Sequence, residues 1–110
     1  MAAVLASVLV AACAVRLETA EKPATECLLA RVAGVIAVDP ALGVGVRTAD
    51  GEFRRTVWPF GWTARIEFGS AVLYDMRGLA VAREGNEIAM AGFVSEDGIA
   101  YPCGPVVIIG

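Results

Sequence analysis

Histidine and glutamine are absent from this sequence, and lysine and asparagine occur once each, as Lys22 and Asn86. Histidine is the commonest general base and the commonest metal ligand in proteins, so its absence removes many catalytic and metal-dependent mechanisms. Phosphate-binding glycine loops, nucleophile elbows and zinc-ligand spacings are missing too. We therefore expect no cofactor, no metal site and no catalytic residues.

An excess of positive charge is also missing. The chain carries nine basic and twelve acidic residues, which gives a net charge of -3. Binding to a phosphate backbone needs a positive face, so we do not expect nucleic acid as a partner. The basic cluster of Arg47, Arg54 and Arg55 is expected to form a solvated strand face, balanced by Asp50 and Glu52.

Charged residues are absent from the first fifteen positions. Residues 1–13 form an apolar run shorter than the roughly 20 residues that a spanning helix needs, which is typical of an export signal. Its end, Val10-Ala11-Ala12-Cys13, resembles a bacterial lipobox, in which the cysteine is lipidated. Two alternatives stay open: cleavage after Ala14, and a buried N-terminal helix. We expect an exported protein, either facing outward from the cell membrane on a lipid at Cys13 or secreted.

Cysteine is scarce, and its count of three is odd. If Cys13 is lipidated, Cys27 and Cys103 remain as a pair in an oxidising compartment. They fall near the two ends of the β-rich part of the chain, so a disulfide between them would close the domain. In the chain-entropy model a bridge across a loop of that length contributes about 4 kcal/mol. The alternative is two isolated buried thiols.

Long amphipathic helices are missing as well. Residues 14–26 are polar and aperiodic, which predicts a flexible tether. Residues 27–110 predict one all-β domain, because β-rich runs alternate with turn residues. Six or seven short strands indicate a small closed or nearly closed β-barrel. The candidate runs from which these strands are drawn are 28–38, 43–48, 52–58, 64–68, 71–74, 79–82, 87–94 and 106–109, with a hairpin turn at Asp50-Gly51 and an irregular crossing at 101–105.

Large aromatic residues are few, at 7% of the chain, but both tryptophans lie in one short stretch. Pro59 fixes its own φ and removes a backbone donor, and Gly61 can adopt positive φ. A strand that arrives at Trp58 must therefore bend, and Trp62 follows directly after the bend. We call residues 58–62 the aromatic corner.

The aromatic corner has two interpretations. In the functional one, Trp58, Phe60 and Trp62 form a stacking platform for a flat ligand, and Arg65 holds an anionic group. In the structural one, the rings fill one end of the barrel, and Arg65 lies over a ring face or pairs with a carboxylate.

The aromatic corner also carries a resemblance. The runs Val57-Trp58-Pro59-Phe60-Gly61-Trp62-Thr63-Ala64-Arg65 and Asp75-Met76-Arg77-Gly78-Leu79-Ala80-Val81-Ala82-Arg83-Glu84-Gly85-Asn86 resemble small uncharacterised exported bacterial proteins with a WPPG(Y/F)xAR corner and a later (D)GxxVAxxGDxV segment. The resemblance covers residues 28–110 and implies an OB-like barrel, so we expect an OB-like β-barrel of five to seven short strands. Phe60 replaces a proline of that pattern. Asn86 replaces an aspartate, so an ion-binding role for that carboxylate would not carry over.

The function expected from these features is binding without catalysis, in the cell envelope. The partner would be an envelope protein or a small extracellular ligand, and the aromatic corner would be its surface. One alternative is a purely structural envelope protein. Another is a hydrolase that uses two of the scattered carboxylates, although their spacing brings no particular pair together.

Overall fold

The computed structural model describes residues 15–110, and the predicted signal with Cys13 and Ala14 lies outside this range. The described residues form nine β-strands and no helix, so the all-β prediction is confirmed. They include no helix long and apolar enough to cross a membrane. The strands are β1 (Ala30–Asp39), β2 (Gly43–Arg47), β3 (Phe53–Arg54), β4 (Thr63–Glu67), β5 (Ser70–Tyr74), β6 (Ala80–Arg83), β7 (Glu87–Val94), β8 (Ala100–Pro102) and β9 (Val107–Ile108).

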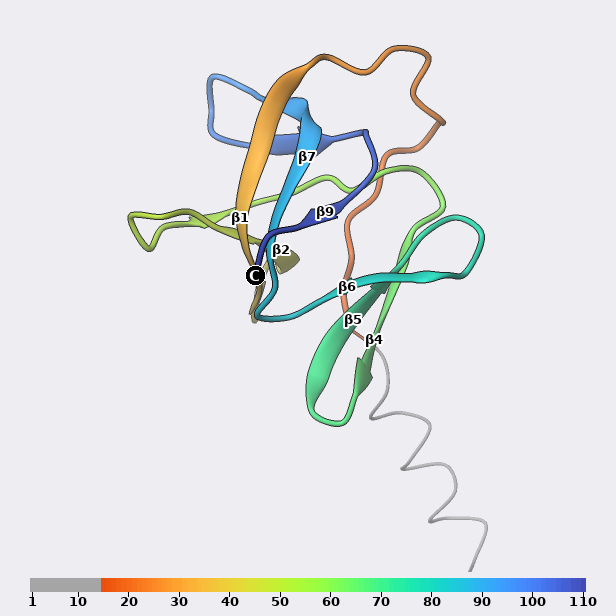
Figure 1. The fold of residues 1–110 in the computed structure, drawn as a ribbon, viewed down its shortest axis with the longest axis vertical. Helices are drawn as coiled ribbons and strands as arrows, with labels where there is room; N and C mark the ends of the chain where they lie inside the picture. The colour runs from red at the N-terminus through yellow and green to blue at the C-terminus, as the bar shows by residue number, and fades with distance from the viewer. Residues whose placement is uncertain (1–14) are drawn as a thin grey trace, which may run out of the picture.

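The strands make two antiparallel sheets, which Figure 1 shows as separate groups. The larger sheet has the order β3-β2-β1-β7-β8, and β9 also pairs with β7. Its β2–β3 hairpin turns at the predicted Asp50-Gly51, where Gly51 has a φ of 87°. The smaller sheet has the order β4-β5-β6. Its β4–β5 turn places Phe68 and Gly69 at the tip, both with positive φ.

The core lies between these sheets and is centred on apolar side chains that alternate along the strands. Ile88 and Met90 are buried from β7, and Val32 and Ile36 from β1. This period of two is the pattern of a strand with one face in the core. The other buried members are Val44, Val46, Trp58, Ala71, Val72, Leu73, Ala82 and Ala100.

The strand β8 corrects the expectation of an irregular crossing at residues 101–105. Tyr101 pairs with Phe93 of β7, and Pro102 ends the strand opposite Gly92. A proline is tolerated there because it ends an edge strand. A Cβ atom on Gly92 would lie 2.4 Å from the carbonyl oxygen of Tyr101, so the two backbones approach closely. The strand β9 lies within the run predicted at residues 106–109, so β8 is the strand that was not expected.

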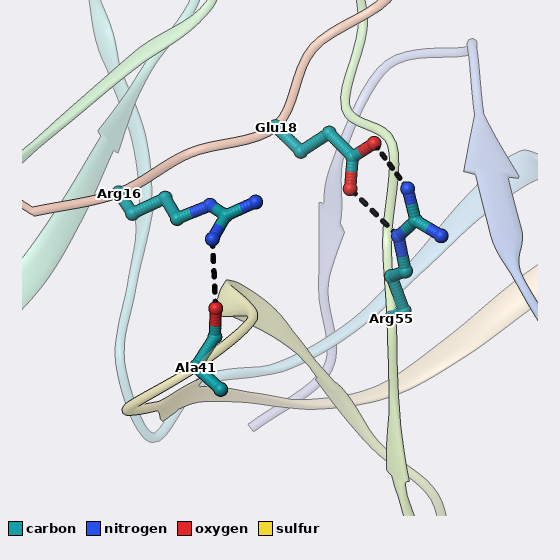
Figure 2. Close-up of polar contacts among 4 residues, drawn as sticks. All are labelled: Arg16, Glu18, Ala41 and Arg55. Atoms are coloured by element: carbon teal, nitrogen blue, oxygen red, sulfur yellow. Dashed lines mark hydrogen bonds and ion pairs between the residues drawn. The ribbon is translucent and has the colours of Figure 1, made fainter.

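Residues 15–20 are not the tether that their polar composition predicts. The Arg16 carbonyl accepts a hydrogen bond from Val44 N at 3.1 Å, and the Arg16 guanidinium donates to Ala41 O at 2.8 Å. Glu18 receives two hydrogen bonds from Arg55, at 2.6 and 2.8 Å (Figure 2). The Arg55 guanidinium holds the pKa of Glu18 below its ordinary value. Backbone pairing and a bidentate ion pair, which composition does not reveal, fix this segment to the domain.

The chain then leaves the sheets before it returns as β1. Residues 21–30 are exposed, and we call residues 21–28 the arm. The two cysteines predicted to pair join the arm to the end of β8: their sulfur atoms lie 2.04 Å apart and their Cα atoms 5.6 Å apart. The arm is therefore attached at both of its ends.

Candidate ligand-binding groove

The aromatic corner begins on a segment that is paired on two sides. Val57 N donates to Ala100 O, and Trp58 N donates to Glu18 O, both at 2.9 Å. The Trp58 carbonyl in turn accepts from Ala20 N. These bonds hold the last residues before the bend in place, so the position of the first indole is fixed by its backbone.

The bend itself is a tight turn from Pro59 to Trp62. Trp62 N donates to Pro59 O at 3.3 Å, and Gly61 has a φ of 79°. Glycine is required at this position for two reasons. The φ is positive, and a Cβ atom would lie 2.7 Å from the Cγ of Met76. The turn therefore brings Met76 against the aromatic corner.

Trp58 has a structural role. Its side chain is 0% exposed, and its indole Nε1 donates to Val44 O at 2.9 Å. A buried indole that has satisfied its donor offers no free face to a ligand. This burial favours the structural interpretation for Trp58. Its buried ring supports the residues that line the site.

Trp62 lies on top of Trp58. The ring centroids are 5.8 Å apart and the planes differ by 15°, which is a stacked arrangement. Trp62 remains partly exposed, and Phe60 beside it is 38% exposed. The aromatic corner thus has a buried end at Trp58 and an open end at Phe60 and Trp62.

A second ring stack, which was not predicted from the sequence, faces the same space. Phe93 and Tyr101 are partners across β7 and β8, with ring centroids 4.8 Å apart and planes 12° apart. The signal was present in the sequence: the turn at residues 95–98 sets these two residues opposite each other once β8 is recognised as a strand. The nearby prolines concealed that strand.

These rings line a pocket of about 410 Å³. A second pocket of about 440 Å³ is also lined by Trp62. Four residues belong to both walls: Pro59, Trp62, Met76 and Cys103. We call the two pockets together the aromatic groove, because they share these four residues. Its side chains are mostly apolar: Leu28, Val57, Trp58, Pro59, Phe60, Trp62, Met76, Val81, Phe93, Tyr101, Pro102, Pro105 and Val106.

The arm forms one wall of the aromatic groove. Lys22, Pro23, Ala24 and Glu26 line the first pocket. One end of the arm follows the pairing of Thr19 with Trp58, and the other end is the disulfide at Cys27. The shape of the groove on this side therefore depends on the covalent bond.

The polar residues of the second pocket belong to the turn after β5. The Asp75 carboxylate accepts hydrogen bonds from Arg77 N and Leu79 N, at 2.9 and 3.1 Å. The backbone N–H of Leu79 is the main cause of a lowered pKa at Asp75. The Arg77 guanidinium, 3.3 Å away, balances the charge of the carboxylate. This turn also carries Met76, which is 62% exposed.

Arg65 is not part of the groove. It lies on β4, with its guanidinium 4.5 Å from the centre of the Tyr74 ring. Its Nε is 3.4 Å from the Glu67 carboxylate, an ion pair that is too poorly aligned for a hydrogen bond. These contacts match the structural interpretation for Arg65, so the predicted platform of four residues separates: Phe60 and Trp62 face the groove, Trp58 lies beneath it and Arg65 lies elsewhere.

The three arginines of the basic cluster have local partners. Arg47 stacks over Phe53 at 5.8 Å, Arg54 donates to Gly98 O at 3.3 Å, and Arg55 binds Glu18. Within residues 15–110, no three acidic or cysteine side chains gather closely enough to hold a metal ion.

Comparison of the chain with protein-family models, with curated proteins and with solved structures finds no match. A function for this chain is therefore inferred from the geometry of the aromatic groove.

Proposed function

We propose that this protein is a non-enzymatic binding module of the cell envelope, and that the aromatic groove holds an apolar ligand. The observation that carries the proposal is the partly exposed pair of ring stacks around a pocket of about 410 Å³. Ligand sites are concave, mostly apolar and already formed before binding, with polar groups at few positions. The groove has each of these properties.

The composition of the walls favours a neutral, apolar ligand. The charged side chains of the groove are Lys22, Glu26, Asp75 and Arg77, and the last two neutralise each other. A sugar would leave most of its hydroxyl groups unpaired against rings and prolines, at a cost for each one. An apolar ligand would instead release water from the exposed parts of Phe60 and Phe93.

Export of the protein is part of this proposal. It is supported by the uncharged residues 1–15, which end in a lipobox-like Cys13, and by the disulfide between Cys27 and Cys103. Disulfides persist mainly in oxidising compartments outside the cytoplasm. The intact mass of the membrane and soluble fractions tests the two routes: a lipid-modified chain starting at Cys13 indicates an anchor, and a soluble chain starting near Val15 indicates release.

We also propose that the larger sheet closes into an OB-like barrel. Support comes from the residues after β3, which hydrogen-bond to β8 at the opposite edge of the sheet. Val57 N donates to Ala100 O and Ala100 N donates to Arg55 O, both at 2.9 Å. Closure would leave few unpaired strand edges, which could otherwise pair with another chain.

A titration with the neutral fluorescent dye N-phenyl-1-naphthylamine tests the binding function. We expect saturable binding, and we expect Trp62→Ala to weaken it by about tenfold, because losing one aromatic stacking contact removes 1 to 3 kcal/mol. The matched control is Phe68→Ala, which removes another exposed ring, at the tip of the β4–β5 turn. Dye binding that is absent, or equally weakened by both substitutions, would contradict the proposal.

A further inference from the structure

We propose that two copies of this chain associate through the outer face of the larger sheet, which is the side of β1, β7 and β9 that points away from the core. These three strands lie side by side in the order β1-β7-β9 (Figure 1). The side chains that carry the proposal are not part of the aromatic groove. The inference therefore goes beyond the proposed binding function and does not rest on it.

The register of the sheet decides which side chains form the outer face. Successive residues of a strand point to opposite sides of a sheet, so the buried residues of β1 and β7 alternate with those of the outer face. Residues that are partners across two strands share a side. The outer face therefore has three pairs across β1 and β7, which are Arg31 with Ala91, Ala33 with Ala89, and Val35 with Glu87.

Large apolar side chains gather on the outer face although it is open to water. Leu29, two residues before Arg31, is 92% exposed, and Val107 and Ile109 of β9 are about half exposed. Val107 is the partner of Ala89, which places β9 on the same face. All three large side chains line one hollow of about 530 Å³. Contiguous exposed apolar surface of this kind marks an interaction site, because covering it releases water.

The outer face also carries two charges of opposite sign. Arg31 lies near one end of it and Glu87 near the other, and the Ala33–Ala89 pair lies midway between them. Within residues 15–110, neither charge takes part in an ion pair. One cation and one anion at equal distances from the centre make the face complementary to a copy of itself.

A two-fold axis brings the matching groups of two copies together. The axis lies between the two outer faces, passes over their Ala33–Ala89 pairs and exchanges the two ends of each face. Arg31 of each copy then lies opposite Glu87 of the other copy. Ile109, whose N–H bonds to Glu87 O at 2.7 Å, lies at the same end as Glu87 and is brought towards Leu29 of the other copy. Opposite charges and large apolar side chains therefore meet in one arrangement, and the occupant that fits this face is a second copy of this chain.

Charge reversal tests the arrangement. Sedimentation equilibrium of the full disulfide-bonded chain, in a density-matched non-ionic detergent that disperses the apolar residues 1–13, measures the dissociation constant of the dimer. Arg31→Glu and Glu87→Arg each place like charges opposite each other twice per dimer, so each should raise this constant by about tenfold or more. The double substitution restores two pairs of opposite charges, and it should return the constant to within about threefold of its original value.

The matched control is Arg83→Glu. It reverses another exposed strand arginine, on β6, that takes part in no ion pair of the described residues, so the dissociation constant should not change. Dye binding should be the same in all of these variants, because none of the substituted residues lines the aromatic groove. A chain that stays monomeric, a dimer that neither charge reversal weakens, or a double substitution that restores nothing would each overturn the inference.

Discussion

The two tryptophans of the aromatic corner are four positions apart and have opposite environments. Trp58 ends a segment whose backbone bonds to Ala100, Glu18 and Ala20, and its ring is fully buried. Trp62 follows the turn and precedes β4, an edge strand with β5 as its one partner in the sheet. The number of backbone segments beside each indole, rather than its chemistry, decides which of them joins the core. Trp58 therefore stabilises the fold at one end of the aromatic corner, and Trp62 lines the groove at the other end.

This contrast predicts the largest difference in stability. Trp58→Ala should lower the free energy of unfolding by about 4 kcal/mol, because it removes a large buried ring and leaves its acceptor Val44 O without a partner. Trp62→Ala should lower it by about 1.5 kcal/mol, since part of that ring is already in water. Urea denaturation followed by circular dichroism measures both values. Equal losses would mean that both rings belong to the core and that the comparison fails.

The disulfide is expected to affect both stability and ligand binding, because it holds the arm beside the open end of the aromatic corner. Replacing both Cys27 and Cys103 by serine should cost up to about 4 kcal/mol, since the bridge closes a loop with a sequence separation of 76. It should also weaken dye binding, because the arm forms a wall of the groove. Mass spectrometry with and without reduction verifies the bridge. Free thiols at both positions in the native protein would contradict this prediction.

Much of the fold could be predicted because turns and strands leave local signals. Asp50-Gly51 and the β-rich runs on either side predicted a hairpin, and the structure has the β2–β3 hairpin at this position. The strand β8 was missed because Pro102, Cys103 and Pro105 follow Tyr101 closely, and local propensity cannot show that β7 lies alongside. The tether predicted at residues 14–26 was wrong for residues 15–20 for the same reason: pairing of Glu18 and Ala20 with Trp58 is a long-range contact.

The candidate site could be predicted only in part. The sequence located Phe60 and Trp62, which face the groove, but it could not separate them from Trp58 or from Arg65. Both indoles flank the same turn, and a turn does not specify which side is covered. The second ring stack follows from the turn at residues 95–98 only once β8 is recognised as a strand that pairs with β7, and the prolines after Tyr101 concealed that strand.

Phe68 carries an exposed ring that lies outside the groove. Phe68 is fully exposed and has a φ of 52°, in the left-handed region that bulky residues avoid. Asparagine followed by glycine suits a two-residue turn in which both residues have positive φ. Phe68→Asn should therefore raise the free energy of unfolding by about 1 kcal/mol, measured by urea denaturation, and leave dye binding unchanged. A loss of stability would show that the Phe68 ring makes contacts that its exposure does not suggest.

The smallest expected effect concerns the ion pair that fastens residues 15–20 to the buried end of the corner. Because Arg55 lowers the pKa of Glu18, the folded protein binds a proton at this carboxylate less readily than the unfolded chain does. The pair therefore stabilises the fold above the unfolded pKa, and this contribution disappears as the pH falls through the folded pKa. Glu18→Gln should cost about 0.5 kcal/mol at pH 7, as is usual for exposed pairs, and almost nothing at strongly acidic pH. Glu21→Gln, an exposed change outside the ion pairs of the described residues, is the matched control. An equal loss at both pH values would mean that packing of the Glu18 side chain, not its charge, holds the segment in place.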